Sequence, residues 1–346
     1  MHRGLDALCP SAPVSPPAGT GIAPDLVDFL AGLTARDTDE VARLLDILLH
    51  HPPRDQHQWI GRSDLNANQS PVQALLAAKP GRWEARLLGD PAFHRGDPIA
   101  RWQGSLSVLA ATLTAAGATS LREMIDLTLA TIVPTDEASR RAYPTGMIRI
   151  AVPLMSSGIA VYVSPPPQSD RWMVARRWAS AVFGDPQPAL RIITAAEKSA
   201  TLFGVGLEGA APARMRAKIY WRMQDPVPLS SFGIALFERE TVRNFMAAVM
   251  RRNTFPLRAL TFSAGFAPLS GALTDIKIDV CNAGAGWGLS EGLALASHQA
   301  LALDLVMPPF DPAAIRSAAH RVAIACLGLG LDREGGHRLN IYLQQH

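Results

Sequence analysis

The stretch of sequence that decides the fold is RMRAKIYWRM, residues 214–223. Side chains of a β-strand point alternately to opposite faces, so this stretch separates its polar residues from its apolar residues. One face carries Arg214, Arg216, Lys218, Tyr220 and Arg222, and the other carries Met215, Ala217, Ile219, Trp221 and Met223. The alternation predicts a strand whose apolar face packs on a hydrophobic layer and whose other face is basic and phenolic.

Strand pairs of this kind recur along the chain at intervals of about sixty residues, which is the signature of a structural repeat. Each unit has two alternating segments joined by a turn that contains Gly, Pro or Ser, and this pattern predicts a β-hairpin. The four clear hairpins pair 148–152 with 158–162, 204–208 with 216–220, 263–266 with 275–279, and 328–332 with 338–342. A fifth, weaker hairpin would pair 58–65 with 82–88.

Helical stretches fill the gaps between the hairpins. The predicted segments are 98–116, 120–132, 170–183, 188–199, 229–237, 239–252, 290–303 and 311–319, after two earlier helices that open at Asp25 and near Asp37. Helix pairs of this kind can cover the apolar face of a sheet. We therefore expect an α+β fold in which repeated ββαα units form a closed antiparallel ten-stranded β-barrel with its helices outside. Closure is favoured because it removes exposed strand edges, and an open solenoid is the alternative.

Composition limits the functions that this chain can have. Residues 1–24 are rich in Pro, Gly, Ser and Ala and predict a disordered leader before one domain at 25–346. The 33 Lys and Arg against 30 Asp and Glu give a net charge of +3, too even for a nucleic-acid binder recognised by bulk charge. Cys9, Cys281 and Cys326 have no CxxC spacing, so we expect neither a disulfide framework nor a metal site. No apolar run is long enough to span a membrane, and the expected location is the cytoplasm.

The polar strand faces predict an active site inside the barrel. A barrel of eight strands is just filled by its side chains, so one of about ten strands leaves room for a ligand. Lysine and arginine side chains neutralise phosphate groups, and tyrosine rings stabilise a cation above their faces. The alternative is an ordinary solvated face of a half-exposed sheet. Matching basic and phenolic residues on several strands favour the enclosed site.

The motifs Arg216-Ala-Lys218-Ile-Tyr220 and Arg338-Leu-Asn340-Ile-Tyr342, with the ββαα repeat, resemble the ABBA-type (PT-barrel) prenyltransferases. This family includes the dimethylallyltryptophan synthase group and the shorter cyanobactin peptide prenyltransferases. The resemblance covers residues 57–346. It implies transfer of an isoprenyl group from an allylic diphosphate, dimethylallyl or geranyl, to an electron-rich aromatic or nitrogen acceptor. The acceptor would be a side chain of a cyclic or linear peptide, or an amino-acid-derived natural product.

The resemblance also implies roles for individual residues. The diphosphate-binding positions are Arg86, Arg216, Lys218, Lys277, Arg338 and Asn340, and a shield for the allylic cation is formed by Tyr162, Tyr220 and Tyr342. The sequence departs from the pattern at Asp279, where the repeat leads us to expect tyrosine. This departure either weakens the shield or places a carboxylate beside the acceptor, and an ion pair with Lys277 is the further alternative.

An acidic residue of the first hairpin would orient the acceptor and remove its proton. The candidates are Glu84 and then Asp64, while the alternative for Glu84 is a cross-strand ion pair with Arg82 or Arg86. The sequence has no DDxxD motif, which argues against an α-helical isoprenoid synthase with a Mg²⁺ cluster. We expect no resident cofactor, and assistance of the diphosphate by Mg²⁺ stays open. The alternative function is a non-catalytic barrel that binds an anionic or isoprenoid ligand, and an interaction scaffold is the third hypothesis.

Overall fold

A computed structural model describes residues 23–53, 61–250 and 256–345 of the chain. The predicted leader therefore lies almost entirely outside the described residues. The strands are β1 (Val72–Lys79), β2 (Arg82–Gly89), β3 (Ile148–Pro153), β4 (Ile159–Val163), β5 (Ala200–Gly209), β6 (Arg216–Met223), β7 (Leu260–Phe266), β8 (Leu273–Cys281), β9 (Val322–Asp332) and β10 (His337–Gln345). The helices are α1 (Pro24–Thr34), α2 (Thr38–Leu48), α3 (Pro98–Ala115), α4 (Arg122–Ile132), α5 (Glu137–Arg141), α6 (Arg171–Val182), α7 (Gln187–Ala196), α8 (Glu240–Met250), α9 (Asn282–Ala285), α10 (Leu289–Ala302) and α11 (Pro312–Ala318).

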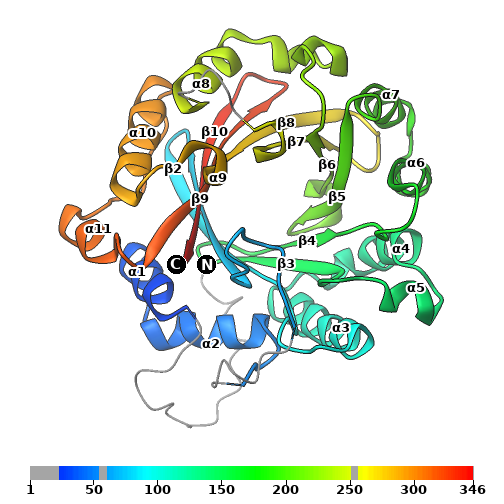
Figure 1. The fold of residues 1–346 in the computed structure, drawn as a ribbon, viewed down its shortest axis with the longest axis horizontal. Coiled ribbons are helices and arrows are strands. Elements are labelled where there is room, and N and C mark those ends of the chain that lie inside the picture. Colours follow the sequence, from blue (N-terminus) through cyan, green and yellow to red (C-terminus); the bar gives the residue numbers. More distant parts are fainter. Residues whose placement is uncertain (1–22, 54–60, 251–255, 346) are drawn as a thin grey trace.

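The ten strands form one closed antiparallel barrel, and most of the helices form a ring around it (Figure 1). Each strand pairs with its neighbours in sequence, and β1 closes the circle by pairing with β10. At this seam Ala77 lies opposite Asn340 and Leu75 lies opposite Tyr342. The predicted closed barrel is therefore confirmed, and the open solenoid is excluded.

Four of the five predicted hairpins are present, but the prediction for the first hairpin is wrong. Strand β2 pairs with β1 over the register from Val72↔Gly89 to Lys79↔Arg82. Residues 61–65 belong to no strand, and residues 54–60 lie outside the described part of the chain. The reason for the error lies in β1, whose sequence VQALLAAK lacks polar alternation because Leu75 and Ala77 also face the lumen.

The helices begin and end close to the predicted positions, and their caps explain why. The Asp170 side chain accepts hydrogen bonds from the first turn of α6, and Asp37, Asp97 and Asp311 do the same for α2, α3 and α11. Segment 229–237 differs from the prediction of one helix. It forms two short 3₁₀ turns, Leu229–Phe232 and Ala235–Glu238, because Gly233 between them adopts a left-handed conformation with φ of 64°.

The hydrophobic core lies between the outer face of the barrel and the helices. Trp221 on β6 is fully buried and packs against Phe262 of β7 and Phe232, with ring centroids 6.3 and 5.5 Å away. Burial of one such side chain stabilises the fold by about 1.5–3 kcal/mol. The apolar face of RMRAKIYWRM therefore points outward, and its polar face must point to the barrel axis. Within the described residues, no helix combines the length and the apolar character needed to cross a membrane.

Candidate active site

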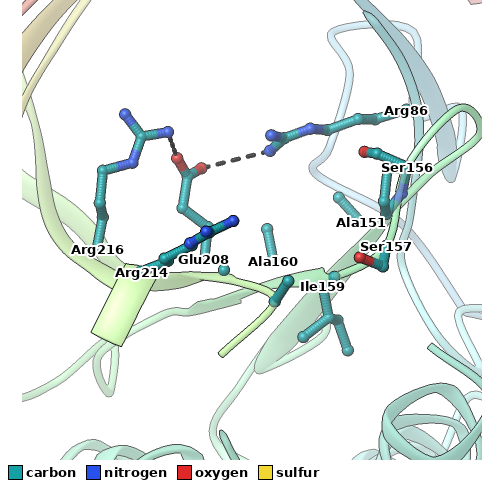
Figure 2. A pocket seen from close by; sticks show the side chains of 13 residues that line it. Arg86, Ala151, Ser156, Ser157, Ile159, Ala160, Glu208, Arg214 and Arg216 are labelled. Atoms are coloured by element: carbon teal, nitrogen blue, oxygen red, sulfur yellow. Dashed lines mark hydrogen bonds and ion pairs between the residues drawn. The ribbon is translucent and has the colours of Figure 1, made fainter. Parts of the chain in front are cut away.

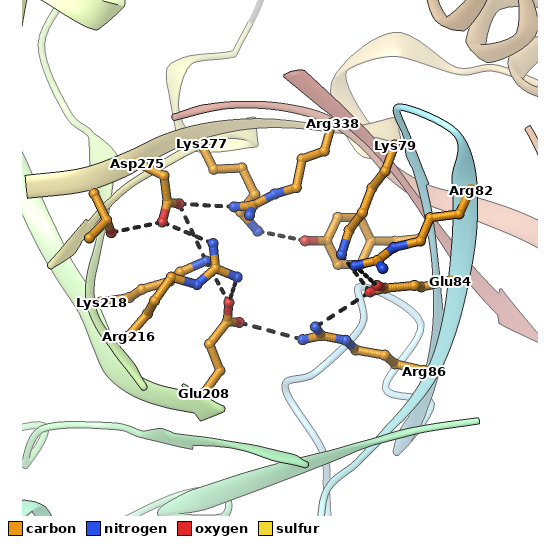
Figure 3. A network of polar contacts seen from close by, with 12 residues as sticks. Lys79, Arg82, Glu84, Arg86, Glu208, Arg216, Lys218, Asp275, Lys277 and Arg338 are labelled. Carbon is orange, nitrogen blue, oxygen red and sulfur yellow. Dashed lines mark hydrogen bonds and ion pairs between the residues drawn. The ribbon is translucent and has the colours of Figure 1, made fainter. Parts of the chain in front are cut away.

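The lumen of the barrel has two different ends. All hairpin turns lie at one end, which we call the hairpin end, formed by residues 80–81, 154–158, 210–215, 267–272 and 333–336. Near this end, charged side chains from β1, β2, β5, β6, β8 and β10 meet around the axis (Figure 3). Lys218, Asp275 and Lys277 are only 2–7% exposed, although they point away from the hydrophobic core.

Glu208 on β5 holds the first group of cations. Its carboxylate lies 3.2 Å from Lys218 Nζ and 3.5 Å from Arg86 Nη1, and it forms a third ion pair with Arg216. Arg86 is on β2, and Arg216 and Lys218 are on β6. Strand β6 is the direct neighbour of β5 in the barrel wall, whereas β4 and β3 lie between β5 and β2. Glu208 therefore holds Arg86, a residue that lies 122 positions before it in the sequence, beside Arg216 and Lys218.

Asp275 on β8 holds a second group that overlaps the first. Its carboxylate lies 2.9 Å from Arg338, 3.0 Å from Arg216 and 3.6 Å from Lys218. Arg216 and Lys218 are thus shared between Asp275 and Glu208. Buried carboxylates with several charge-assisted partners fix the directions of those partners strongly.

Glu84 on β2 forms the third group. Lys79 Nζ lies 2.6 Å from its carboxylate, and Arg82 and Arg86 lie 3.1 and 3.9 Å away. The expected ion pairs of Glu84 with Arg82 and Arg86 are therefore present, but they run along β2, and the cross-strand partner is Lys79. The three carboxylates, together with Asp279, face seven basic side chains in these groups, so positive charge is in excess. The seven are Lys79, Arg82, Arg86, Arg216, Lys218, Lys277 and Arg338.

Deeper in the lumen, tyrosine rings surround one cation. The Lys277 ammonium lies 5.1 Å from the ring centroid of Tyr342 and 5.6 Å from that of Tyr220, within the range of a cation–π interaction. It also donates a hydrogen bond of 2.5 Å to the Tyr342 hydroxyl. Tyr162 contacts Tyr220 edge to face, with centroids 5.8 Å apart. All three predicted shield residues thus lie in one enclosed space.

Two polar atoms in this part of the lumen have no hydrogen-bond partner among the described residues. Asp279 pairs with Lys277 of its own strand through Oδ2 at 2.5 Å, but its buried Oδ1 has no partner in the described part of the chain. The same holds, within the residues that the structure describes, for the buried hydroxyl of Ser263 on β7. Buried polar atoms are usually satisfied in a complete site, so both are available to a ligand. Asn340, also predicted from the family pattern, is buried and lies opposite Gly328 on β9.

Glycines on the first strands of the hairpins make room for these side chains. A Cβ atom on Gly206 would lie 3.0 Å from the Tyr162 ring and 3.2 Å from the Tyr220 ring. A Cβ atom on Gly328 would lie 2.0 Å from Asp279 Oδ1. A side chain at either position would therefore collide with residues that face the lumen and would reduce the space available to a ligand.

Burial and ion pairing shift the pKa values of these groups. Burial alone would raise the pKa of Glu208, but Lys218, Arg216 and Arg86 outweigh it and hold that pKa well below its ordinary value. Burial lowers the pKa of Lys218 to about 7, although Asp275 and Glu208 oppose the change. Burial also raises the pKa of Tyr220 well above its ordinary value, so this phenol stays neutral. The lumen therefore contains fixed carboxylates, neutral phenols and one lysine that titrates near neutrality.

Asp64 lies apart from the hairpin end. It precedes β1 and forms an ion pair with Arg149 and a hydrogen bond of 2.9 Å with Thr145. Arg149 stands near the start of β3, at the end of the barrel opposite the hairpin turns. Asp64 therefore does not belong to the first hairpin, contrary to the sequence prediction, and it is not among the contacts of the charged groups described above.

A pocket of about 160 Å³ opens at the hairpin end. Arg86, Arg216 and Glu208 line it together with Ser156 and Ser157 of the turn between β3 and β4, as Figure 2 shows. Because one water molecule occupies about 30 Å³ in the liquid, the pocket has room for a polyatomic anion. Guanidinium groups and hydroxyls are the donors that bind phosphate oxygens.

Glu208 and Asp275 are the two prominent site residues that were not predicted as such. Glu208 stands in the quoted segment 204–208, and Asp275 shares a face with Lys277 and Asp279. The shared face pointed to Asp275, whereas the neighbours of Glu208 on its face of β5 are Gly204 and Gly206, which give no such signal. Among the described residues, no cluster of three or more His, Cys, Asp or Glu side chains is arranged to hold a metal ion. Cys281 and Cys326 lie opposite each other on β8 and β9 as free thiols, with their sulfur atoms 3.0 Å apart.

Solved structures with the same architecture are known. The 5-dimethylallyltryptophan synthase from Streptomyces coelicolor superposes with a TM-score of 0.74 at 16% identity, over 94% of this chain and 98% of that one. A 6-dimethylallyl tryptophan synthase gives a TM-score of 0.75 at 16% identity, over 94% and 97% of the two chains. The prenyltransferase PriB, in a binary complex with product diphosphate, gives 0.68 at 21% identity, over 93% and 94%. No family model matches the sequence, and no curated protein is significantly similar to it. The likeness therefore establishes the fold, which is the PT barrel.

Proposed function

We propose that this chain is a prenyltransferase that moves an isoprenyl group from an allylic diphosphate to an electron-rich aromatic or nitrogen acceptor. The observation that carries the proposal is the position of the Lys277 ammonium, which lies over the rings of Tyr220 and Tyr342 inside a closed barrel. The lumen thus already holds a cation against aromatic faces beside an excess of basic side chains. An allylic cation and its diphosphate leaving group need the same two environments.

The proposed reaction starts when the C–O bond of the allylic diphosphate breaks and its electron pair leaves with the diphosphate. Arg86, Arg216 and Lys218 stabilise the negative charge that develops on the leaving group, because they are preorganised by their ion pairs. The tyrosine rings stabilise the allylic cation, and the barrel wall keeps water away from it. The acceptor then forms a bond to the allylic carbon and loses a proton. The other diphosphate-binding candidates are Lys277, Arg338 and Asn340.

Two carboxylates are candidates for the acceptor side of the reaction. Asp279 has an unpaired buried oxygen beside Lys277 and the tyrosine rings, and it is suited to accept a hydrogen bond from an N–H group. Glu84 lies among Lys79, Arg82 and Arg86, which outweigh the effect of burial and lower its pKa. Glu84 is therefore ionised and able to take the acceptor proton. Indole, imidazole and guanidine groups fit these requirements, as free amino acids or within a peptide, and we place the reaction in the cytoplasm.

The solved relatives support this assignment by what they bind. One structure of PriB is a ternary complex with L-tryptophan and dimethylallyl thiolodiphosphate, and the 5-dimethylallyl tryptophan synthase from Streptomyces coelicolor was solved with DMASPP and Trp. Both ligand classes match a lumen with basic side chains near one end and aromatic rings below them.

The test is to incubate the purified protein with dimethylallyl or geranyl diphosphate and a panel of amino acids and peptides. Mass spectrometry should detect an acceptor that has gained one isoprenyl group. Lys218→Ala should lose donor binding in calorimetry, whereas the exposed Lys198→Ala should bind as the unchanged protein does. Donor binding without any transfer across the panel would favour the non-catalytic barrel. No binding of either diphosphate would refute the proposal.

A further inference from the structure

Glu208 is an anion that occupies part of the proposed diphosphate site. Its carboxylate lies between the guanidinium groups of Arg86 and Arg216 at the wall of the pocket that opens at the hairpin end (Figure 2). Its side chain is only 11% exposed. A diphosphate that enters this pocket needs the guanidinium donors of Arg86 and Arg216. These donors are already paired with the Glu208 carboxylate.

We propose that Glu208 is a positioning residue that competes with diphosphate for Arg86 and Arg216 and thereby promotes release of inorganic diphosphate after each turnover. The inference rests on the proposed function. It concerns the affinity of the site for the leaving group, whereas the proposed function concerns the transfer itself.

The three ion pairs of Glu208 differ in strength. The difference indicates which of these cations a diphosphate would take over from Glu208. Arg86 is the most distant partner, with its Nη1 3.5 Å from Glu208 Oε2. Lys218 lies 3.2 Å away on the inner side, and it is also held by Asp275. A diphosphate would therefore take over Arg86 and Arg216 from the pocket side. Lys218, whose ammonium has three donors, would keep its ion pair with Glu208 and also donate to the diphosphate.

The like charges of Glu208 and the diphosphate would then face each other in a partly buried site, where repulsion is stronger than in water. This repulsion lowers the affinity of the site for every diphosphate. The allylic donor gains further affinity from its isoprenyl chain among the tyrosine rings, but inorganic diphosphate has no such compensation. Glu208 thus weakens the contact that donor and product share, so that the donor stays bound through its isoprenyl chain while inorganic diphosphate is released.

Asp275 provides an internal comparison. It shares Arg216 and Lys218 with Glu208 and also contacts Arg338, but it is not among the residues that line the pocket. Asp275 therefore orients Arg216 and Lys218 from outside the pocket lining, whereas Glu208 lies at the pocket wall where the anion enters. The two carboxylates have different roles although they share partners.

The experiment measures binding of inorganic diphosphate by calorimetry to the unchanged protein and to Glu208→Gln. The control variant is Glu197→Gln, which removes one carboxylate of an ion pair with Arg176 on the helical layer. We expect Glu208→Gln to bind inorganic diphosphate about ten- to a hundredfold more tightly, with an equal fall in its inhibition constant during turnover. Glu197→Gln should match the unchanged protein.

Equal or weaker binding to Glu208→Gln, in a protein that transfers prenyl groups, would overturn the inference and leave the proposed function standing. If neither the unchanged protein nor the variant binds diphosphate and no transfer occurs, the proposed function fails as well. Glu208→Gln also removes one of the carboxylates that pair with Arg86, Arg216 and Lys218 and so lowers stability. Inorganic diphosphate should then raise the melting temperature of Glu208→Gln more than that of the unchanged protein, and no such rescue would also refute the inference.

Discussion

Raising the pH above 7 should weaken binding of the allylic diphosphate, because it removes the charge of Lys218. Burial holds the pKa of this lysine at about 7, far below its ordinary 10.5, although Asp275 and Glu208 oppose the shift. A diphosphate beside Nζ adds negative charge and raises the pKa again. Binding above pH 7 therefore takes up a proton, and affinity falls as the pH rises.

The size of the effect follows from this linkage. The dissociation constant rises by about tenfold per pH unit between the pKa of the free protein and that of the complex. Between pH 7 and pH 9 the increase should therefore be about tenfold to a hundredfold. The free energy of unfolding should change in the opposite direction and increase as the pH rises. The reason is that a lysine whose pKa is lowered in the folded state destabilises the protein when it is charged. That destabilisation is relieved as the pH rises from about 7 towards 10.5.

Calorimetric titration with dimethylallyl diphosphate across pH 7–9 measures the effect, and Lys218→Met provides the reference. Methionine fills a similar volume without a charge, so this variant should bind weakly at every pH. The unchanged protein should approach the affinity of the variant at pH 9. A pH-independent affinity of the unchanged protein, or a variant with the same slope, would refute the assignment of Lys218 to the donor.

Three further changes test other parts of the structure. Asp275→Asn should lower the free energy of unfolding in urea by about 3–5 kcal/mol, because it removes a buried carboxylate that Arg216, Lys218 and Arg338 share. Gly206→Ala should slow transfer more with geranyl than with dimethylallyl diphosphate, since its Cβ would press on Tyr162 and Tyr220; equal slowing would contradict this. Deletion of 337–345 should abolish the cooperative thermal transition, because it removes the strand between β1 and β9, and a retained transition would refute the dependence on closure.

The sequence predicted the architecture where one strand face was polar and the other apolar. RMRAKIYWRM and the segments near Lys277 and Arg338 alternate clearly, so their hairpins and their inward faces were predicted correctly. The prediction was wrong at β1 because Leu75 and Ala77 give its lumen face apolar side chains like those of its core face. A strand that is apolar on both faces has no period of two for sequence reasoning to detect.

The partners within the site could not be predicted in the same way. Whether Glu208 meets Arg86 depends on how far the barrel wall curves between β5 and β2, and no local pattern contains that information. The position of Cys281 opposite Cys326 depends likewise on the register between β8 and β9. Asp64 was assigned to the first hairpin because the strand before β2 was misplaced, and its true partner is Arg149.

The seam between β1 and β10 also constrains how the protein is made. The ribosome produces β1 early, but the strand that pairs with its free edge is the last element of the barrel to be synthesised. Until then the nascent chain presents two open strand edges and an unfinished lumen with buried charges. The barrel can therefore close only after translation of β10, so that its assembly is a late event.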